Sequence, residues 1–167
     1  ACLQLGIGAL PNLIGNMLAD SDLKDLGIQS EMFCDAFVTL YEKGKITNAR
    51  KNYDRNKSTY SFCLGTQDTY DFLDGNPRCA SCTVQYTNDP SRVAMQDNMI
   101  AINNILEIDL LSQVCSETHG LRQISGTGGQ LDFVVGAFHS KGGKAILAFT
   151  STFKDKEGKL HSRIKPL

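Results

Sequence analysis

The sequence has no apolar run of the roughly 18 residues that a membrane-spanning helix requires. Its apolar opening, ACLQLGIGALPNLIG, lacks a basic flank and is followed by acidic residues, which is not typical of a secretory signal. We therefore expect a soluble protein. The chain starts at Ala1, not at a methionine, and passes directly into a strand pattern, so we expect it to be a piece of a longer protein.

An excess of positive charge is also lacking, which excludes a general affinity for nucleic acid. The 17 lysines and arginines are balanced by 18 acidic residues, giving a formal net charge of −1. Residues 139–167 depart from this balance, with 7 basic and 2 acidic residues. A solvated, lysine-rich surface explains such a bias, and a contact with a phosphorylated ligand is the alternative.

A set of zinc ligands is missing as well. RCASC supplies one pair, Cys79 and Cys82, but there is no second pair, and the three histidines are widely separated. A redox pair is expected at the start of a helix, whereas the following TVQYT is typical of a strand. The six cysteines are scattered through helix-like and strand-like segments, which indicates reduced thiols in a cytoplasmic protein.

The glycine-rich segments lack the spacing of the common nucleotide fingerprints. Gly6-Ile7-Gly8 has no third glycine, because position 11 is proline, and SKGGK does not have the P-loop spacing. SGTGGQLDF precedes a predicted helix whose first amides could face an anion. A tight turn explains each segment alone, but three together favour a binding rim. Its candidate residues are Gly6, Ile7, Gly8, Gly126, Gly128, Gly129, Lys141 and Lys144.

What the sequence does contain is an alternation of strand and helix patterns. Its 167 residues, 41% of them apolar, fit one globular domain. Strands are predicted at residues 2–8, 25–30, 59–65, 82–87, 99–110 and 145–152. Helices are predicted at residues 11–21, 31–44, 66–76 and 131–143. This alternation predicts an α/β fold with an open, mostly parallel sheet flanked by helices.

Glu31 is the candidate catalytic residue. In the predicted helix EMFCDAFVTLYEKG it occupies the first turn, where a carboxylate often serves only to stabilise the helix. The chemical interpretation is that this carboxylate attacks a thioester carbonyl while glycine-turn amides stabilise the oxyanion. The local sequence pattern does not decide between these two interpretations of Glu31.

Seven segments, in order along the chain, resemble the C-terminal half of the acetyl-CoA hydrolase/transferase family, in particular its 4-hydroxybutyrate and butyryl-CoA:acetate CoA-transferases. They are LQLGIGALPN, LGIQSEMFCDAFVTLYEKGKITNARK, YDFLDGNP, YTNDP, INNILEIDLLSQVCSE, SGTGGQLDFVVGA and SKGGKAI. The family's H-T-E-M block carries its nucleophilic glutamate. It reads Gln29-Ser30-Glu31-Met32 here, with glutamine and serine as departures.

The resemblance implies that Glu31 is the nucleophile of a ping-pong CoA transfer through a glutamyl-CoA thioester. The oxyanion amides would lie in Gly6-Ile7-Gly8 and in Gly126–Gly129. The substrates would be a short-chain acyl-CoA and a carboxylate such as acetate, with no metal or prosthetic group and no nucleic-acid or membrane partner. Residues 1–167 would form one C-terminal domain, a fragment that lacks the N-terminal half and the C-terminal end of the enzyme. We expect this fragment to be inactive by itself. We also expect a homo-oligomer.

Three alternatives compete with this hypothesis. Water could accept the acyl group, which would make the protein an acyl-CoA hydrolase. The basic C-terminal segment and SGTGG could form a non-catalytic module for phosphorylated ligands. Glu117 and His119 are two residues apart, so they would share a face of a strand and could share acid–base work.

Overall fold

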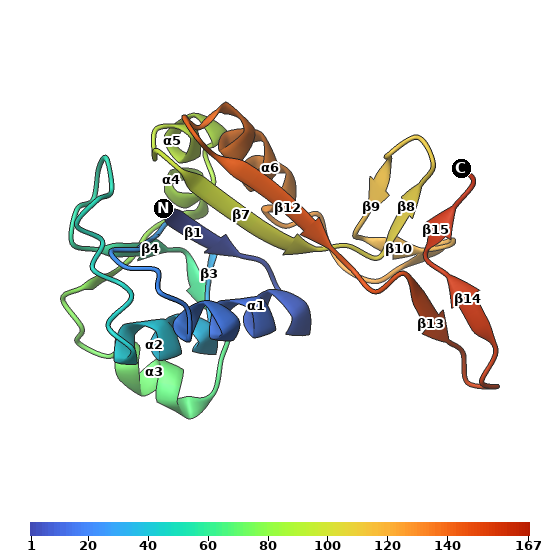
Figure 1. The fold of residues 1–167 in the computed structure, drawn as a ribbon, viewed down its shortest axis with the longest axis horizontal. Coiled ribbons are helices and arrows are strands. Elements are labelled where there is room, and N and C mark those ends of the chain that lie inside the picture. The colour runs from blue at the N-terminus through green and yellow to red at the C-terminus, as the bar shows by residue number, and fades with distance from the viewer.

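The computed structural model describes residues 1–167, and its centre is a sheet of four parallel strands in the order β12-β7-β1-β2 (Figure 1). The predicted open parallel sheet is thereby confirmed. Its strands are β1 (Cys2–Leu5), β2 (Gly27–Ile28), β7 (Met99–Asn104) and β12 (Lys144–Ala148). Because all four run in the same direction, their carboxyl ends meet at one edge of the sheet.

Helices cover both faces of this sheet (Figure 1). On one face lie α1 (Ala9–Ala19), α2 (Asp35–Glu42) and α3 (Gln67–Leu73). On the other lie α4 (Val84–Thr87), α5 (Pro90–Ala94) and α6 (Gln130–His139). None of these helices has the length and apolar character needed to pass through a bilayer.

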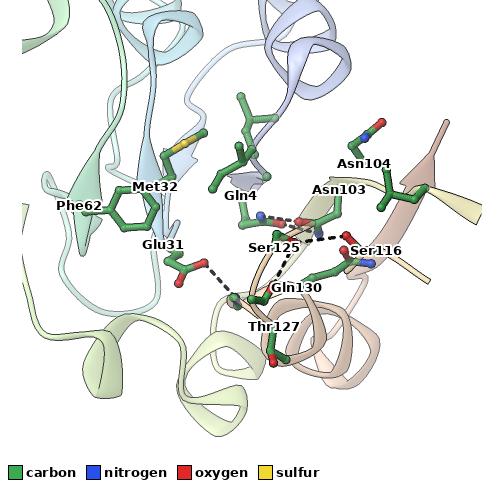
Figure 2. Close-up of a pocket in the computed structure, with 17 residues that line it drawn as sticks. Gln4, Glu31, Met32, Phe62, Asn103, Asn104, Ser116, Ser125, Thr127 and Gln130 are labelled. Carbon is green, nitrogen blue, oxygen red and sulfur yellow. Dashed lines mark hydrogen bonds between the residues drawn. The ribbon is translucent and has the colours of Figure 1, made fainter. Parts of the chain in front are cut away.

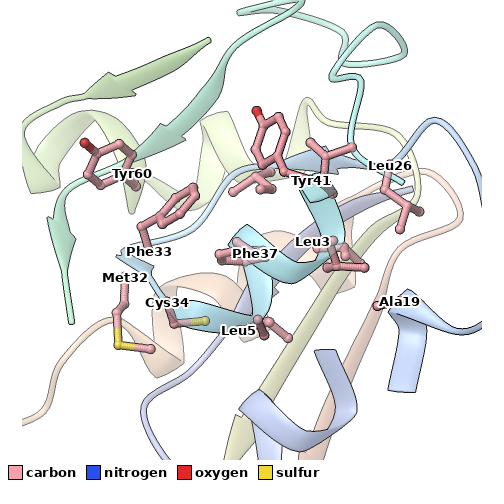
Figure 3. Close-up of a cluster of buried hydrophobic side chains, with 14 of the residues drawn as sticks. Leu3, Leu5, Ala19, Leu26, Met32, Phe33, Cys34, Phe37, Tyr41 and Tyr60 are labelled. Carbon is pink, nitrogen blue, oxygen red and sulfur yellow. The ribbon is translucent and has the colours of Figure 1, made fainter. Parts of the chain in front are cut away.

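Two apolar clusters, one on each side of the sheet, hold these layers together. Successive strand residues point to opposite faces, so neighbours such as Cys2 and Leu3 belong to different clusters. The larger cluster joins β1 to α2 and contains the fully buried Phe33 and Phe37, whose ring centroids are 5.3 Å apart (Figure 3). The smaller one packs α5 and α6 against β1 and β7.

Two short parallel pairs extend the structure beside β2. β3 (Met32–Phe33) pairs with β5 (Phe62–Cys63), and β4 (Ser58–Tyr60) pairs with β6 (Cys79–Ser81). A bridge between Gln29 and Thr59 connects them to the end of β2. The chain around residue 31 is therefore held in extended form on both sides.

An arm of residues 106–128 and 149–167 projects from the layered body (Figure 1). The sequence analysis did not expect it. Three of its pairings, β8 with β9, β10 with β11 and β13 with β14, are antiparallel, and β15 adds to β8 in parallel. Its strands are β8 (Glu107–Asp109), β9 (Val114–Cys115), β10 (Thr118–His119), β11 (Arg122–Gln123), β13 (Thr152–Lys154), β14 (Leu160–Ser162) and β15 (Ile164–Lys165).

Some element boundaries predicted from the sequence are wrong. Residues 84–87 are helical and not part of a strand, and residues 31–34 precede α2 because Met32 and Phe33 pair with β5. Residues 99–110 form β7 and then β8, which belong to different sheets, and residues 59–65 divide between β4 and β5. The chain passes from one sheet to another within apolar runs that look continuous in the sequence.

Candidate active site

The carboxyl edge of the parallel sheet surrounds a cavity of about 440 Å³ (Figure 2). The turn after β1, the end of β7, the segment after β2 and the loop before α6 all contribute to its wall. This is the usual ligand position in an open α/β sheet. Its lining residues are Gln4, Leu5, Gly6, Ile7, Glu31, Met32, Phe62, Asn103, Asn104, Leu106, Ser116, Ser125, Gly126, Thr127, Gly128, Gly129 and Gln130.

Glu31 lies in the short connection between β2 and β3, not in the first turn of a helix as predicted. Its backbone carbonyl accepts hydrogen bonds from the N–H groups of Ser61 (2.8 Å) and Phe62 (3.1 Å). These two bonds fix the backbone in the extended form that leads into β3. Glu31 therefore does not stabilise α2 from its first turn, because α2 begins four residues later at Asp35.

The side chain of Glu31 points across the cavity to the start of α6 (Figure 2). Its Oε2 accepts a hydrogen bond from the N–H of Gly129, at 3.0 Å. Gly129 is the N-cap residue of α6, so the carboxylate faces the end of the helix where unpaired amides concentrate positive partial charge. Two predicted site elements, 98 residues apart, are thus in direct contact.

The glycines of this loop serve two different physical needs. Gly129 has an ordinary φ of −97°, but a Cβ there would lie 2.6 Å from Oε2 of Glu31, so a larger residue would displace the carboxylate from its contact. Gly128 has a φ of 57°, in the left-handed region that favours glycine. A Cβ on Gly126 would meet open space.

Asn88 is part of the site that the sequence analysis missed. Its side chain is buried, with 5% exposed, and a Cβ on Gly129 would also overlap its Nδ2. The Thr87 hydroxyl donates to its Oδ1 at 2.8 Å, while the Thr87 carbonyl accepts from Gln29 Nε2 at 3.1 Å. This places an amide NH₂ beside both Gly129 and Glu31. Asn88 belongs to YTNDP, one of the segments that resemble the family, but nothing in that segment alone indicates a position beside Glu31.

The turn after β1 offers the cavity fewer free backbone amides than predicted. The N–H of Gly6 donates to the Ile102 carbonyl at 2.8 Å and so continues the sheet. Ile7 and Gly8 keep backbone amides that have no backbone acceptor, and Gly8 lies beside a second cavity rather than in the first. A role in oxyanion stabilisation therefore remains a prediction for these two amides.

The structure does not bring Lys141 and Lys144 into the cavity. Lys144 pairs with Ile100 at the amino end of β12, whereas Ala148, at the cavity end, pairs with Asn104. Both lysines are exposed at the sheet edge opposite Glu31. A contact with a phosphate group of CoA remains a prediction.

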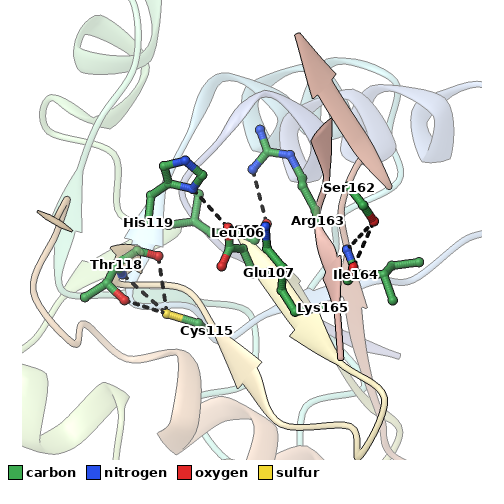
Figure 4. A network of polar contacts seen from close by, with 9 residues as sticks. All are labelled: Leu106, Glu107, Cys115, Thr118, His119, Ser162, Arg163, Ile164 and Lys165. Carbon is green, nitrogen blue, oxygen red and sulfur yellow. Dashed lines mark hydrogen bonds and ion pairs between the residues drawn. The ribbon is translucent and has the colours of Figure 1, made fainter. Parts of the chain in front are cut away.

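The alternative acid–base pair, Glu117 and His119, is not formed in the structure. Instead, His119 Nδ1 lies 3.0 Å from Glu107 Oε1, which is also 3.4 Å from Lys165 Nζ (Figure 4). Beside them the Cys115 thiol receives hydrogen bonds from Thr118, whose hydroxyl above all lowers the pKa of that thiol. His119 therefore links strands of the arm.

All six cysteines are free thiols, as expected. Cys82 does precede a helix, contrary to the predicted strand. However, burial raises the pKa of Cys79 to about 11 and also raises that of Cys82. These shifts disfavour the thiolate forms that redox chemistry requires.

Fold and site together define an α/β domain with a carboxylate at the carboxyl edge of a parallel sheet, held against a helix N-terminus. Residues 65–167 match the family model of the acetyl-CoA hydrolase/transferase C-terminal domain. The chain belongs to the acetyl-CoA hydrolase/transferase family, as its resemblance indicated.

The similar proteins include named CoA-transferases. The chain is 57% identical to butyryl-CoA:acetate CoA-transferase of Anaerostipes caccae over 99% of its length, and 47% identical to 4-hydroxybutyrate coenzyme A transferase of Clostridium kluyveri over 100%. Acetyl-CoA hydrolase of Kluyveromyces lactis is more distant, with 28% identity over 79% of the chain. RipA from Yersinia pestis is similar in structure, with a TM-score of 0.91, 44% identity and 100% of this chain covered. The chain spans 37% of the A. caccae protein and of RipA, and 38% of the C. kluyveri protein.

Proposed function

We propose that the full-length protein is a CoA-transferase that moves CoA between a short-chain acyl-CoA, such as butyryl-CoA or 4-hydroxybutyryl-CoA, and a carboxylate such as acetate. The observation that carries this proposal is the Glu31 carboxylate held 3.0 Å from the Gly129 amide in a cavity at the sheet edge. The names of the similar proteins support the substrates.

The proposed reaction begins with attack of a Glu31 carboxylate oxygen on the thioester carbonyl. A carbon–oxygen bond forms and the carbon–sulfur bond breaks, leaving a mixed anhydride and CoA thiolate. The thiolate then attacks the glutamyl carbonyl carbon, forming a new carbon–sulfur bond and releasing the first acyl group as a carboxylate. The incoming carboxylate reverses both steps. The reaction involves no oxidation or reduction, and no metal or prosthetic group takes part.

Gly129 has a specific role in the second step. When thiolate attacks the glutamyl carbonyl, negative charge develops on the Glu31 oxygen that does not leave. The Gly129 N–H already contacts Oε2 of Glu31, so it can stabilise this oxyanion without rearrangement. Such a donor typically contributes about 3 to 4 kcal/mol to transition-state stabilisation.

The test uses the full-length protein, butyryl-CoA and mass spectrometry of the peptide that contains Glu31. We expect a glutamyl-CoA adduct on Glu31, and modification of the same residue after borohydride reduction. Glu31→Gln should lack the adduct and lose at least about 1,000-fold in kcat, because the covalent step has no substitute. An adduct on another residue, or a loss below about 100-fold, would overturn the assignment of Glu31.

The same protein separates transfer from its alternatives. With labelled acetate, a transferase forms labelled acetyl-CoA in step with the loss of butyryl-CoA. A hydrolase would release free CoA at the same rate with and without acetate. A module that only binds phosphorylated ligands would give neither product and no adduct.

A further inference from the structure

Lys51 is a lysine whose ammonium group lies in the interior of the domain. The residue is 2% exposed. Its Nζ donates hydrogen bonds to the Ile28 carbonyl (2.9 Å), the Lys57 carbonyl (2.8 Å) and the Thr59 hydroxyl (2.9 Å). An ammonium has three donors, so every one of them is used. A lysine is almost never fully buried unless its charge is paired, which makes the partners of this one informative.

The partners of the Lys51 ammonium are not carboxylates. No ion pair of the structure includes Lys51. Asp54 is reached only through the Thr59 hydroxyl, which donates to Asp54 Oδ2 at 3.1 Å. Burial is the main cause that lowers the pKa of the Lys51 ammonium. The direct contacts of this cation are therefore two backbone carbonyls and one hydroxyl, whose positions it fixes relative to one another.

These contacts join two strands that have little backbone pairing of their own. Ile28 is the last residue of β2, and Thr59 is the middle residue of β4. The backbones of these strands are connected by one isolated bridge, between Gln29 and Thr59. Lys51 therefore adds side-chain hydrogen bonds beside a backbone connection that is one bridge long.

The residues around Lys51 are suited to hold it in this position. Asn48 Oδ1 accepts a hydrogen bond from the Ile28 N–H at 2.8 Å, so both backbone polar groups of Ile28 bind side chains of one loop. Asn48 is 1% exposed and has a φ of 56°, in the left-handed region. A Cβ on Gly27 would lie 2.8 Å from Cγ of Lys51, so the lysine side chain passes directly over this glycine.

The two strands that Lys51 joins also hold the backbone of Glu31. The Ser30 N–H donates to the Thr59 carbonyl at 3.0 Å, and the Glu31 carbonyl accepts two N–H groups from the residues that follow β4. The carboxylate of Glu31 then reaches the amide of Gly129 (Figure 2). Its direction therefore depends on how β2 and β4 are spaced.

We propose that Lys51 is a positioning residue for Glu31, because its buried ammonium fixes the spacing of β2 and β4 and so directs the Glu31 carboxylate. Lys51 does not line the cavity, so it acts through the backbone and not by contact with the substrate. Its removal should slow the chemical step and leave acyl-CoA binding unchanged. This inference rests on the proposed CoA-transferase function.

The test follows formation of the glutamyl-CoA adduct on Glu31 in the full-length protein. Lys51→Met keeps a side chain of similar length and removes the ammonium. In a single turnover with butyryl-CoA, rapid quenching and mass spectrometry give the rate constant and the amplitude of adduct formation. We expect the rate constant to fall at least about 10-fold, with KM for butyryl-CoA within about twofold. A role in folding alone would lower the amplitude and not the rate constant.

Lys45→Met is the matched control. Lys45 Nζ also donates to a backbone carbonyl, that of Ser21, which follows α1 and belongs to neither β2 nor β4. This variant also removes an ammonium from a carbonyl oxygen, and it should leave the rate constant of adduct formation within about twofold of that of the unmodified protein.

Thr59→Val tests the same contact if Lys51→Met does not fold. Valine has the shape of threonine but lacks the hydroxyl that accepts from Lys51, and should slow adduct formation about threefold or more at unchanged KM. The inference would be overturned by rate constants within about twofold of the unmodified value in every Lys51 and Thr59 variant that folds, by an equal loss in Lys45→Met, or by a change confined to KM. In each of these cases the adduct on Glu31 still supports the proposed function. No adduct in the unmodified protein would overturn the proposed function and this inference with it.

Discussion

The carboxylate of Glu31 and the amide of Gly129 are 98 residues apart in the chain and 3.0 Å apart in the structure. The first follows the edge strand β2, and the second caps α6, which packs on β7 and β12 at the other side of the sheet. Their contact therefore forms only when all the strands between β2 and β12 are correctly paired. Separate rigid elements therefore position the proposed nucleophile and an amide donor, as preorganised electrostatic stabilisation would require.

Gly129→Ala should separate this pair. The added Cβ would lie 2.6 Å from Oε2 of Glu31, so the carboxylate must move away. We expect kcat for CoA transfer to fall about 100-fold or more, measured in the full-length protein, with little change in KM. Gly126→Ala adds a methyl group in open space and should cost much less. Equal losses in both variants would show that the contact with Glu31 is not the reason for the glycine.

Asn88→Asp tests the amide beside Glu31. An aspartate would place a second carboxylate next to the first, and like charges raise the pKa of one member of such a pair. We expect lower kcat and an acidic limb of the pH–rate profile that moves to higher pH, because Glu31 must be ionised to attack. Asn88→Ala should lower kcat without moving that limb. A profile unchanged by Asn88→Asp would place the amide too far from Glu31 to matter.

The sequence predicted the sheet and the main helices because apolar periodicity reports local structure. Residues 2–5 and 11–19 have the predicted form, and the glycine loop does precede a helix. Short segments whose pairing partners are distant in the chain were not predicted. Met32 and Phe33 look helical in sequence, but pairing with Phe62 and Cys63 makes them a strand.

The candidate site was predictable where chemistry has a local signature. Glycines before a helix and an acidic residue in a matching block pointed to Gly129 and Glu31, whose contact the structure supplies. Asn88 was missed because its place beside Glu31 is created only by tertiary packing. Conversely, Lys141 and Lys144 were predicted as site residues from their local charge. Charge does not tell which end of a strand a residue occupies, and Lys144 lies at the end of β12 away from the cavity.

Lys141→Ala combined with Lys144→Ala tests the predicted contact with CoA phosphates. If the lysines face a bound phosphate, CoA affinity should fall as salt rises, because screening acts over about 8 Å at physiological ionic strength. The double variant should bind CoA more weakly at low salt and show a flatter salt dependence, measured by calorimetry on the full-length protein. If CoA affinity depends on salt in the double variant as it does in the unmodified protein, the two lysines belong to an ordinary solvated surface.

Asp35→Asn should make the stability of the protein less sensitive to acid. The hydrogen bonds from Thr69 and Thr66 favour the ionised carboxyl and lower its pKa in the folded state. A lowered folded-state pKa adds stability that is present above the ordinary value of 3.8 and is lost as pH falls through the folded-state pKa. Asparagine keeps an acceptor oxygen but no charge, so its hydrogen bonds are weaker by about 1 kcal/mol.

At pH 7 the Asp35→Asn variant should therefore melt about 1 °C below the unmodified full-length protein, because the chain spans only 37% of its A. caccae relative and a longer protein shifts less per kcal/mol. The difference should shrink as the pH falls below about 3.8, because the aspartate then loses the charge that distinguishes it. Asp20→Asn is the matched control, since its exposed side chain accepts no hydrogen bond and its only ion pair, with Lys43, is 3.5 Å long. A melting difference that stays constant from pH 7 to pH 3 would show that Asp35 stabilises this region by its shape rather than by its charge.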